Sequence, residues 1–228
     1  MHRLVGVLVV VVWARAAYAL ESFDLCFNYG CSETVAVVFG DDELERVGAR
    51  FVGVSDAAGE REVMARAVAD LYRIAGEQSP IMADRGGNYA DEGVEGRMDC
   101  IDHSTNTTGF LELMASKGWL RYHVVREPSR RSRIIFQHFS ALVEERDEVQ
   151  PDVPQGVHGG VPDHVAIMLA LCDCPEVVRD AEVVKARQVI PKTAPAQFVV
   201  DTWFEDHARP AVIMPLADWL NGEGPDVQ

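Results

Sequence analysis

A cysteine, a histidine and an aspartate follow one another along this chain in an order that could support thiol chemistry. Nucleophilic catalysis by cysteine needs a thiolate, a histidine that removes and returns its proton, and a third group that orients the imidazole. Cys100 stands at the predicted start of a helix, where unpaired backbone N–H groups favour the thiolate. The carboxylates of Asp99 and Asp102 act against that effect by like charge. A buried structural cysteine, or one in an intermolecular disulfide, is the alternative interpretation.

Two of the seven histidines stand at the start of apolar runs that are typical of strands. His138 opens the run to Val143, and His164 opens the run to Leu169, so either imidazole could project from a strand toward a cysteine on a helix. A histidine more often occupies an ordinary surface or core position than a catalytic one. That interpretation fits four of the others better: His103, His123, His158 and His207. His103 would nevertheless lie within one helical turn of the cysteine and could be its neighbour.

Asp201 interrupts an otherwise apolar run from Phe198 to Phe204. A carboxylate buried in such a run is costly unless it has a partner. The partner could be a catalytic histidine that the carboxylate orients. An ion pair or a bend that the aspartate forms is the alternative.

The cysteine count singles out one thiol. Five cysteines in an exported protein leave one without an intramolecular partner. Cys26 and Cys31 are separated by four residues, and the glycine among them permits the tight turn of a small disulfide loop. Cys172 and Cys174 are separated by one residue, which strains a mutual bridge, so each could instead pair with one of the N-terminal cysteines. In either arrangement Cys100 has no partner for an intramolecular disulfide.

Residues 1–19 have the features of a secretory signal peptide. A basic start at His2 and Arg3 precedes an apolar run from Leu4 to Ala14, and the run ends in a small-residue cleavage site at Ala17–Ala19. A membrane anchor is the alternative, but the run falls well short of the ~20 residues that cross a bilayer. We therefore expect a protein exported to the periplasm or the extracellular medium, with no membrane span after cleavage.

Length and composition predict a single globular domain over residues 20–228. The chain of 228 residues is 48% hydrophobic and 25% charged, and its formal net charge is −15. A chain of this size buries an adequate core without staples. The acidic balance argues against nucleic acid and anionic membrane surfaces as partners.

Apolar periodicity predicts the helices that must position these side chains. A short helix capped by Asp41 or Asp42 ends near Phe51, and a longer one runs from about Glu60 to Gly76. A third helix is predicted from Cys100 to Lys117, although its first two turns are rich in poor helix formers.

Runs of β-branched and aromatic residues predict strands at 34–39, 121–126, 134–144, 198–204 and 211–214. The stretch from Arg146 to Ala196 is rich in proline and glycine at its start and could hold a helix from Pro175 to Arg187. Helices that precede a set of strands predict an α+β domain.

Several segments together resemble a known family. They are Cys26–Cys31 (CFNYGC), Met98–Thr107 (MDCIDHSTNT), His138–Leu142 (HFSAL), Val200–Phe204 (VDTWF), Pro215-Leu216 and Trp219. A cysteine heading a helix, a histidine opening a strand and an aspartate in the next strand are similar to the transglutaminase-like branch of the papain-like fold. More narrowly, the chain from about Asp24 to Trp219 resembles a little-characterised family of exported proteobacterial proteins. The resemblance implies a nucleophile, a base and an orienting carboxylate at Cys100, His138 and Asp201.

The identity of the histidine stays open between His138 and His164. The resemblance favours His138, but 63 positions separate it from Asp201, so that residues 146–196 would be an insertion. His164, 37 positions before Asp201, has the easier spacing, and Asp163–Ile167 is similar to the histidine strand of papain-like cell-wall peptidases.

These observations predict an exported cysteine acyl-transfer enzyme, either a peptidase or amidase or a transglutaminase. Its partner would be a peptide or protein substrate, without cofactor or metal, because the cysteine and histidine spacings match no zinc pattern. A domain that keeps the fold, lacks the activity and binds a peptide or a cell-wall fragment is the alternative. For the oxyanion we expect the backbone N–H of Cys100 as one donor and name Asn88 as the candidate for the second.

Overall fold

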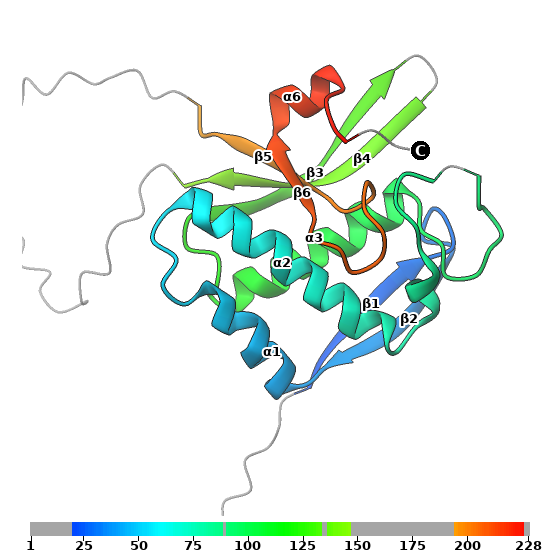
Figure 1. Cartoon of the computed structure of the whole chain (residues 1–228), viewed down its shortest axis with the longest axis horizontal. Helices are drawn as coiled ribbons and strands as arrows, with labels where there is room; N and C mark the ends of the chain where they lie inside the picture. Colours follow the sequence, from blue (N-terminus) through cyan, green and yellow to red (C-terminus); the bar gives the residue numbers. More distant parts are fainter. Residues whose placement is uncertain (1–19, 89, 134–135, 147–193, 226–228) are drawn as a thin grey trace, which may run out of the picture.

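The computed structural model describes residues 20–88, 90–133, 136–146 and 194–225. Within these ranges the fold is α+β, as predicted, and both of its sheets are antiparallel (Figure 1). The predicted signal peptide, the predicted helix at 175–187, and His158, His164, Cys172 and Cys174 lie outside the described residues. No helix in the described part of the chain is both long and apolar enough to cross a membrane.

An N-terminal hairpin pairs β1 (Glu21–Phe27) with β2 (Glu33–Phe39). The sequence predicted only the second of these strands. In β1 the polar residues Glu21, Ser22 and Asp24 weaken the apolar run, and its strand character depends on pairing with β2 and on burial of Leu25 and Phe27.

Two helices and two 3-10 turns follow the hairpin. They are α1 (Asp41–Gly48), η1 (Ala49–Phe51), α2 (Ala57–Gly76) and η2 (Pro80–Ala83). The predicted caps of α1 are wrong, because its N-cap is Gly40, whose N–H donates to the carboxylate of Glu43. Helix α2 starts earlier than predicted because the side chain of Asp56 accepts from the N–H of Gly59.

Helix α3 (Cys100–Ser116) begins at the predicted cysteine despite its unfavourable first turns. Asp99 is the N-cap and accepts from the N–H groups of Ile101 and Asp102. The amide of Asn106 hydrogen-bonds both the N–H and the carbonyl of Cys26 on the hairpin. Tertiary contacts of this kind supply the stability that helix propensity lacks.

The second sheet has the order β3-β4-β5-β6. Its strands are β3 (His123–Arg133), β4 (Phe136–Glu145), β5 (Gln197–Asp201) and β6 (Val212–Pro215). Each strand was predicted, with shifted bounds. Strand β5 ends at Asp201 and not at Phe204 because an oxygen of Asp201 accepts from the N–H of Trp203, which turns the chain.

The two faces of this sheet pack against different helices. Ala141, Val143 and Val200 face the main core, which also holds the buried side of α2 and α3. Leu142 and Val199 alternate with them and pack against Trp219 of the short helix α6 (Leu216–Asn221), which lies above the sheet in Figure 1. The sheet therefore links the N-terminal end of α3 to α6.

Candidate active site at the start of helix α3

A buried ion pair joins His138, near the start of β4, to Asp201, the last residue of β5. Nε2 of His138 lies 2.7 Å from Oδ2 of Asp201, and the two side chains are 10% and 1% exposed. Because β4 and β5 are antiparallel neighbours, the start of one strand and the end of the other lie at the same end of the sheet. Nδ1 of His138 makes no hydrogen bond within the described part of the chain, so this nitrogen is free to accept a proton.

Aromatic rings enclose this pair. The ring centroids of Trp203, Phe204 and Trp219 lie 4.9, 5.5 and 5.5 Å from that of His138. The indole N–H of Trp219 donates to Oδ2 of Asp201 at 2.9 Å, and the backbone N–H of Trp203 donates to Oδ1 at 3.2 Å. These contacts orient the carboxylate in surroundings of low polarity, where hydrogen bonds are strong.

Cys100, the first residue of α3, places its thiol against the backbone on both sides of His138. Its Sγ lies 3.9 Å from the carbonyl oxygen of Gln137, and the backbone N–H of Phe139 hydrogen-bonds the sulfur. Pairing of β4 with β5 begins only at Ala141, so the thiol contacts β4 just beyond the paired segment. Among the described residues the thiol makes no hydrogen bond to the imidazole itself.

The surroundings of Cys100 favour the neutral thiol. Burial raises the pKa of Cys100, and the carboxylates of Asp99 and Asp201 raise it further, whereas the N–H groups of Phe139 and Cys100 lower it. The predicted activation of the thiol by the helix start is therefore outweighed. The physical reason is that the carboxylate of Asp99 already accepts the terminal N–H groups of α3.

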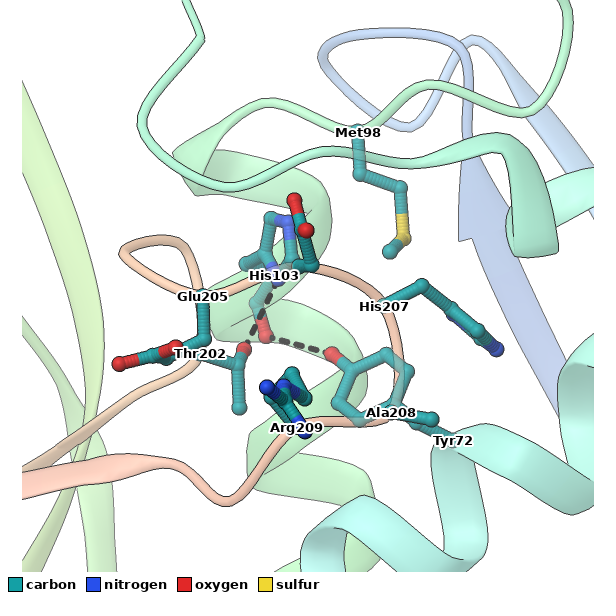
Figure 2. A pocket seen from close by; sticks show the side chains of 9 residues that line it. Tyr72, Met98, His103, Thr202, Glu205, His207, Ala208 and Arg209 are labelled. Atoms are coloured by element: carbon teal, nitrogen blue, oxygen red, sulfur yellow. Dashed lines mark hydrogen bonds between the residues drawn. The ribbon is translucent and has the colours of Figure 1, made fainter. Parts of the chain in front are cut away.

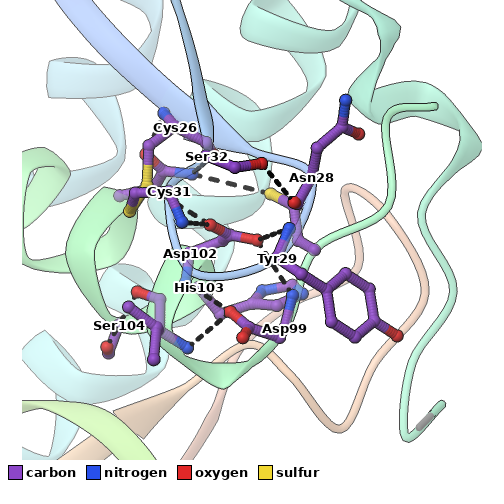
Figure 3. The surroundings of a disulfide bond; sticks show 12 residues. Cys26, Asn28, Tyr29, Cys31, Ser32, Asp99, Asp102, His103 and Ser104 are labelled. Carbon is purple, nitrogen blue, oxygen red and sulfur yellow. Dashed lines mark hydrogen bonds between the residues drawn. A yellow bond between two sulfur atoms is a disulfide. The ribbon is translucent and has the colours of Figure 1, made fainter. Parts of the chain in front are cut away.

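A disulfide loop covers the start of α3. Cys26 and Cys31 are bonded to each other, with sulfurs 2.02 Å apart (Figure 3). The alternative, in which either of them pairs with Cys172 or Cys174, is therefore wrong. The short loop succeeds because residues 28–31 all adopt the left-handed conformation, with φ between 54° and 68°. Three of these four residues are not glycine, so the loop needs external support.

Asp102 supplies that support from the first turn of α3. Its buried carboxylate accepts from the backbone N–H groups of Tyr29 at 2.8 Å, Cys31 at 2.5 Å and Asp99 at 3.0 Å (Figure 3). Burial raises the pKa of Asp102 to about 6, although these N–H groups lower it. One side chain thus fastens the disulfide loop to the helix end that carries Cys100.

The other histidines in the described part of the chain have separate surroundings. His103 does not face Cys100, because its ring nitrogens contact Asp84 and Thr202. His123 is fully buried and is paired with Glu60 on α2. His207 is also partly buried, and burial lowers its pKa.

The structure thus brings Cys100, His138 and Asp201 to one end of the sheet. Sequence reasoning missed the roles of Asp102, Asp84 and Trp219 in holding this end together, although Asp102 and Trp219 both stood in the motifs that carry the resemblance. The sequence held a signal for both aspartates. Neither Asp84 nor Asp102 has a lysine or arginine at the spacing of a helix or strand neighbour, so a buried carboxylate at either position must accept hydrogen bonds from backbone N–H groups.

One group of possible metal ligands occurs among the described residues, formed by Cys26, Cys31 and Asp102. The two sulfurs are joined in the disulfide, and the carboxylate of Asp102 is occupied by backbone N–H groups. This group is therefore a structural cluster. The disulfide is compatible with the oxidising compartment that the predicted signal peptide implies.

Comparisons with known proteins assign the chain to no family. No protein-family model matches the chain, and no curated protein or solved structure matches it either.

Proposed function

We propose that the protein is an exported thiol acyl-transfer enzyme with a transglutaminase-like, papain-like core. In this proposal Cys100 is the nucleophile, His138 is the general base and Asp201 orients the imidazole. The observation that carries the proposal is the buried His138–Asp201 pair beside the half-buried thiol, with Nδ1 of His138 unbonded among the described residues.

The raised pKa of Cys100 determines how the first step would run. Because the resting group is a thiol, the S–H proton must pass to Nδ1 of His138 as the sulfur attacks the carbonyl carbon of an amide. The imidazolium then gives that proton to the leaving amine, and a thioester remains on Cys100. The S–H group must first turn from the carbonyl of Gln137 toward the imidazole, and catalytic hydrogen bonds of this kind often form only when substrate binds.

The oxyanion would be stabilised by donors at the start of α3. The backbone N–H of Cys100 is the first, because the N–H groups of a first helical turn have no partner within the helix. Asn88 is the proposed second donor. The N–H of Gly87, next to it, donates to the carbonyl of Trp203 at 2.7 Å, which ties this segment to the corner after Asp201. The side-chain oxygen of Asn88 accepts from Ala90, so its amide nitrogen is the group available as a donor.

Alkylation of Cys100 by iodoacetamide, followed by mass spectrometry of the Cys100 peptide, tests the proposal. We expect labelling at neutral pH at least about tenfold faster than that of a free-thiol peptide, because a positioned base contributes a factor of this size or more. The Cys100→Ser variant is the control for assignment of the labelled site. A rate at or below that of the free thiol would count against the enzyme.

Water and amines as acceptors can be separated with the same protein. Incubation with peptide amides and a biotinylated primary amine gives a biotinylated product if an amine takes the acyl group, and only hydrolysis if water does. Cys100→Ser should abolish either reaction.

A binding domain without activity is the second candidate. The absence of a thiol–imidazole hydrogen bond in the described residues and the acidic flank of Cys100 favour it. It predicts slow labelling of Cys100 together with binding of a peptide or cell-wall fragment that Cys100→Ser leaves unchanged.

A further inference from the structure

A third buried histidine–carboxylate pair lies behind Asp201, and the proposed acyl transfer does not use it. Nε2 of His103 lies 3.0 Å from Oδ2 of Asp84. Its Nδ1 lies 2.8 Å from the hydroxyl of Thr202, a contact that Figure 2 shows. The side chains of His103 and Asp84 are 5% and 1% exposed. A pair buried this deeply is costly to desolvate, so its position next to the site calls for an explanation.

Thr202 connects this pair to the site because it directly follows Asp201. The strand pairing of β5 ends at Asp201, so beyond the strand Thr202 is held by its carbonyl, which accepts from the N–H of Glu205 at 3.2 Å, and by its side chain. Its hydroxyl contacts that of Thr107 on α3 at 3.0 Å, and Thr107 contacts the hydroxyl of Tyr72 on α2 at 3.1 Å. A buried hydroxyl network thus extends from the two core helices to the residue beside the proposed orienting carboxylate.

The corner formed by residues 201–203 is held from three directions. The N–H of Trp203 donates to the carboxylate of Asp201, and the carbonyl of Trp203 accepts from the N–H of Gly87. His103 holds the residue between them by its side chain. Loss of the His103 contact would leave the side chain of Thr202 with its contact to Thr107 alone.

Charge strengthens this contact. Burial lowers the pKa of His103, but Asp84, Asp201 and Asp102 raise it, and the net direction is upward from 6.5. As an imidazolium the ring carries a proton on both nitrogens, so that Nδ1 can donate to Thr202 while Nε2 forms the ion pair with Asp84. The other polar groups around this ring line a cavity with room for about one water molecule: Tyr72, Glu205, Asp206, His207 and Arg209.

We propose that His103 is a positioning residue for the acyl-transfer site. Its ion pair with Asp84 fixes the imidazole, and its hydrogen bond fixes Thr202, so that the adjacent carboxylate of Asp201 faces His138. This inference rests on the proposed function, and it adds a role for a residue that does not touch the reacting atoms.

The first test compares two matched histidine variants. His103→Gln and His123→Gln each remove a buried, ion-paired imidazole, but His123 has no contact with the Cys100 site. We expect His103→Gln to lower the rate of Cys100 alkylation about tenfold and to move its pH profile toward that of a free thiol. His123→Gln should keep the profile of the wild type. Equal profiles for the two variants would overturn the proposal.

A second pair of variants keeps the test decisive if His103→Gln does not fold. Thr202→Val removes the hydroxyl, whereas Thr202→Ser retains it at almost the same place. We expect Thr202→Val to behave as His103→Gln does and Thr202→Ser to restore most of the wild-type rate. Indistinguishable serine and valine variants would refute the positioning role.

A readout independent of catalysis separates failure of this inference from failure of the proposed function. The indole N–H of Trp219, which donates to Asp201, gives its own NMR signal, identified by its loss in Trp219→Phe. We expect hydrogen exchange of this N–H to be about tenfold faster in His103→Gln and Thr202→Val than in His123→Gln. If wild-type Cys100 labels slowly but this difference in exchange appears, the enzyme proposal fails and the positioning role stands. If the indole exchanges equally in all variants, the positioning role fails.

Discussion

The pairs His138–Asp201 and His123–Glu60 are built from the same two kinds of group but have different surroundings. Nitrogen and oxygen lie 2.7 Å apart in the first and 2.8 Å apart in the second. Both ring nitrogens of His123 have protein contacts, since Nδ1 lies against Glu60 and Nε2 lies 3.2 Å from Arg61. Within the part of the chain that the structure describes, His138 hydrogen-bonds through Nε2 alone.

This difference shows how a buried histidine can be assigned a role. An imidazole whose two nitrogens are both bound has no site left for a proton in transit and serves as a link between elements. Glu60 also accepts from the backbone N–H groups of Arg121 and Tyr122, so the second pair fastens α2 to the segment that leads into β3. The first pair instead presents a free nitrogen beside a thiol.

The largest expected effect contrasts the two histidines. His138→Gln should lower the alkylation rate of Cys100 about a hundredfold, because loss of a general base removes a factor of this order. His123→Gln should leave the rate within about twofold, since distant sites act independently. Time courses of iodoacetamide labelling measure both. A similar decrease of the alkylation rate in the two variants would show that His138 and His123 do not differ in their roles.

The carboxylates sharpen the same contrast. Both the imidazole of His138 and the indole of Trp219 donate to Oδ2 of Asp201. Asp201→Asn should therefore disturb the orientation of the ring and lower labelling of Cys100 about tenfold or more. Wild-type kinetics in this variant, with an unchanged near-UV spectrum, would exclude an orienting role.

Glu60→Gln should act on stability and not on reactivity. It leaves the buried imidazole of His123 without its ion pair, and breaking a buried pair typically costs about 3 kcal/mol of unfolding free energy. Urea denaturation measures the loss. In folded Glu60→Gln protein, iodoacetamide should label Cys100 at the wild-type rate. A slower rate would show that the His123–Glu60 pair influences the His138–Asp201 pair.

Removal of the disulfide should have a smaller effect on stability. The double variant Cys26→Ser, Cys31→Ser frees a short loop, for which chain entropy predicts a loss of about 2 kcal/mol. The N–H contacts to Asp102 remain available, so Cys100 labelling should change little. An unchanged urea midpoint would show that Asp102 alone holds the loop.

The smallest expected effect is the dependence of stability on pH. The pKa of Asp102 is raised from 3.8 to about 6, and that of His103 is raised above 6.5, so each binds more protons in the folded chain than in the unfolded chain. The contribution of Asp102 is present below 3.8 and is lost as pH rises through about 6. The contribution of His103 is present below 6.5 and is lost as pH rises through its folded pKa.

His207 has the opposite sign, because its pKa is lowered and its contribution is lost as pH falls through the folded value. Thermal unfolding between pH 6.5 and 8, below the range in which the raised pKa of Cys100 contributes a decline of the same sign, therefore isolates His103, with a decline in the wild type that His103→Gln removes. A decline of the same size in that variant would contradict a charged His103.

Sequence reasoning predicted the α+β class, the helix that begins at Cys100 and all four strands of the larger sheet. Its errors have two causes. The cap of α1 and the end of β5 depend on hydrogen bonds between a side chain and the backbone two or three positions away, Glu43 with Gly40 and Asp201 with Trp203. The missed strand β1 depends instead on its pairing with β2.

By itself, the sequence determined which chemical groups were available and in which order, because cysteine arithmetic, apolar periodicity and the cost of a carboxylate in an apolar run depend on local composition. It could not choose between His138 and His164 or assign His103. Tertiary structure decided that Asp201 contacts His138, that Asp102 carries the disulfide loop and that His103 lies behind Asp201. The physical reason is that these arrangements depend on hydrogen bonds between residues far apart in the chain: His138 and Asp201 are 63 positions apart, the N–H of Cys31 and the carboxylate of Asp102 are 71 apart, and His103 and Thr202 are 99 apart. Strand pairing and helix packing fix these partners.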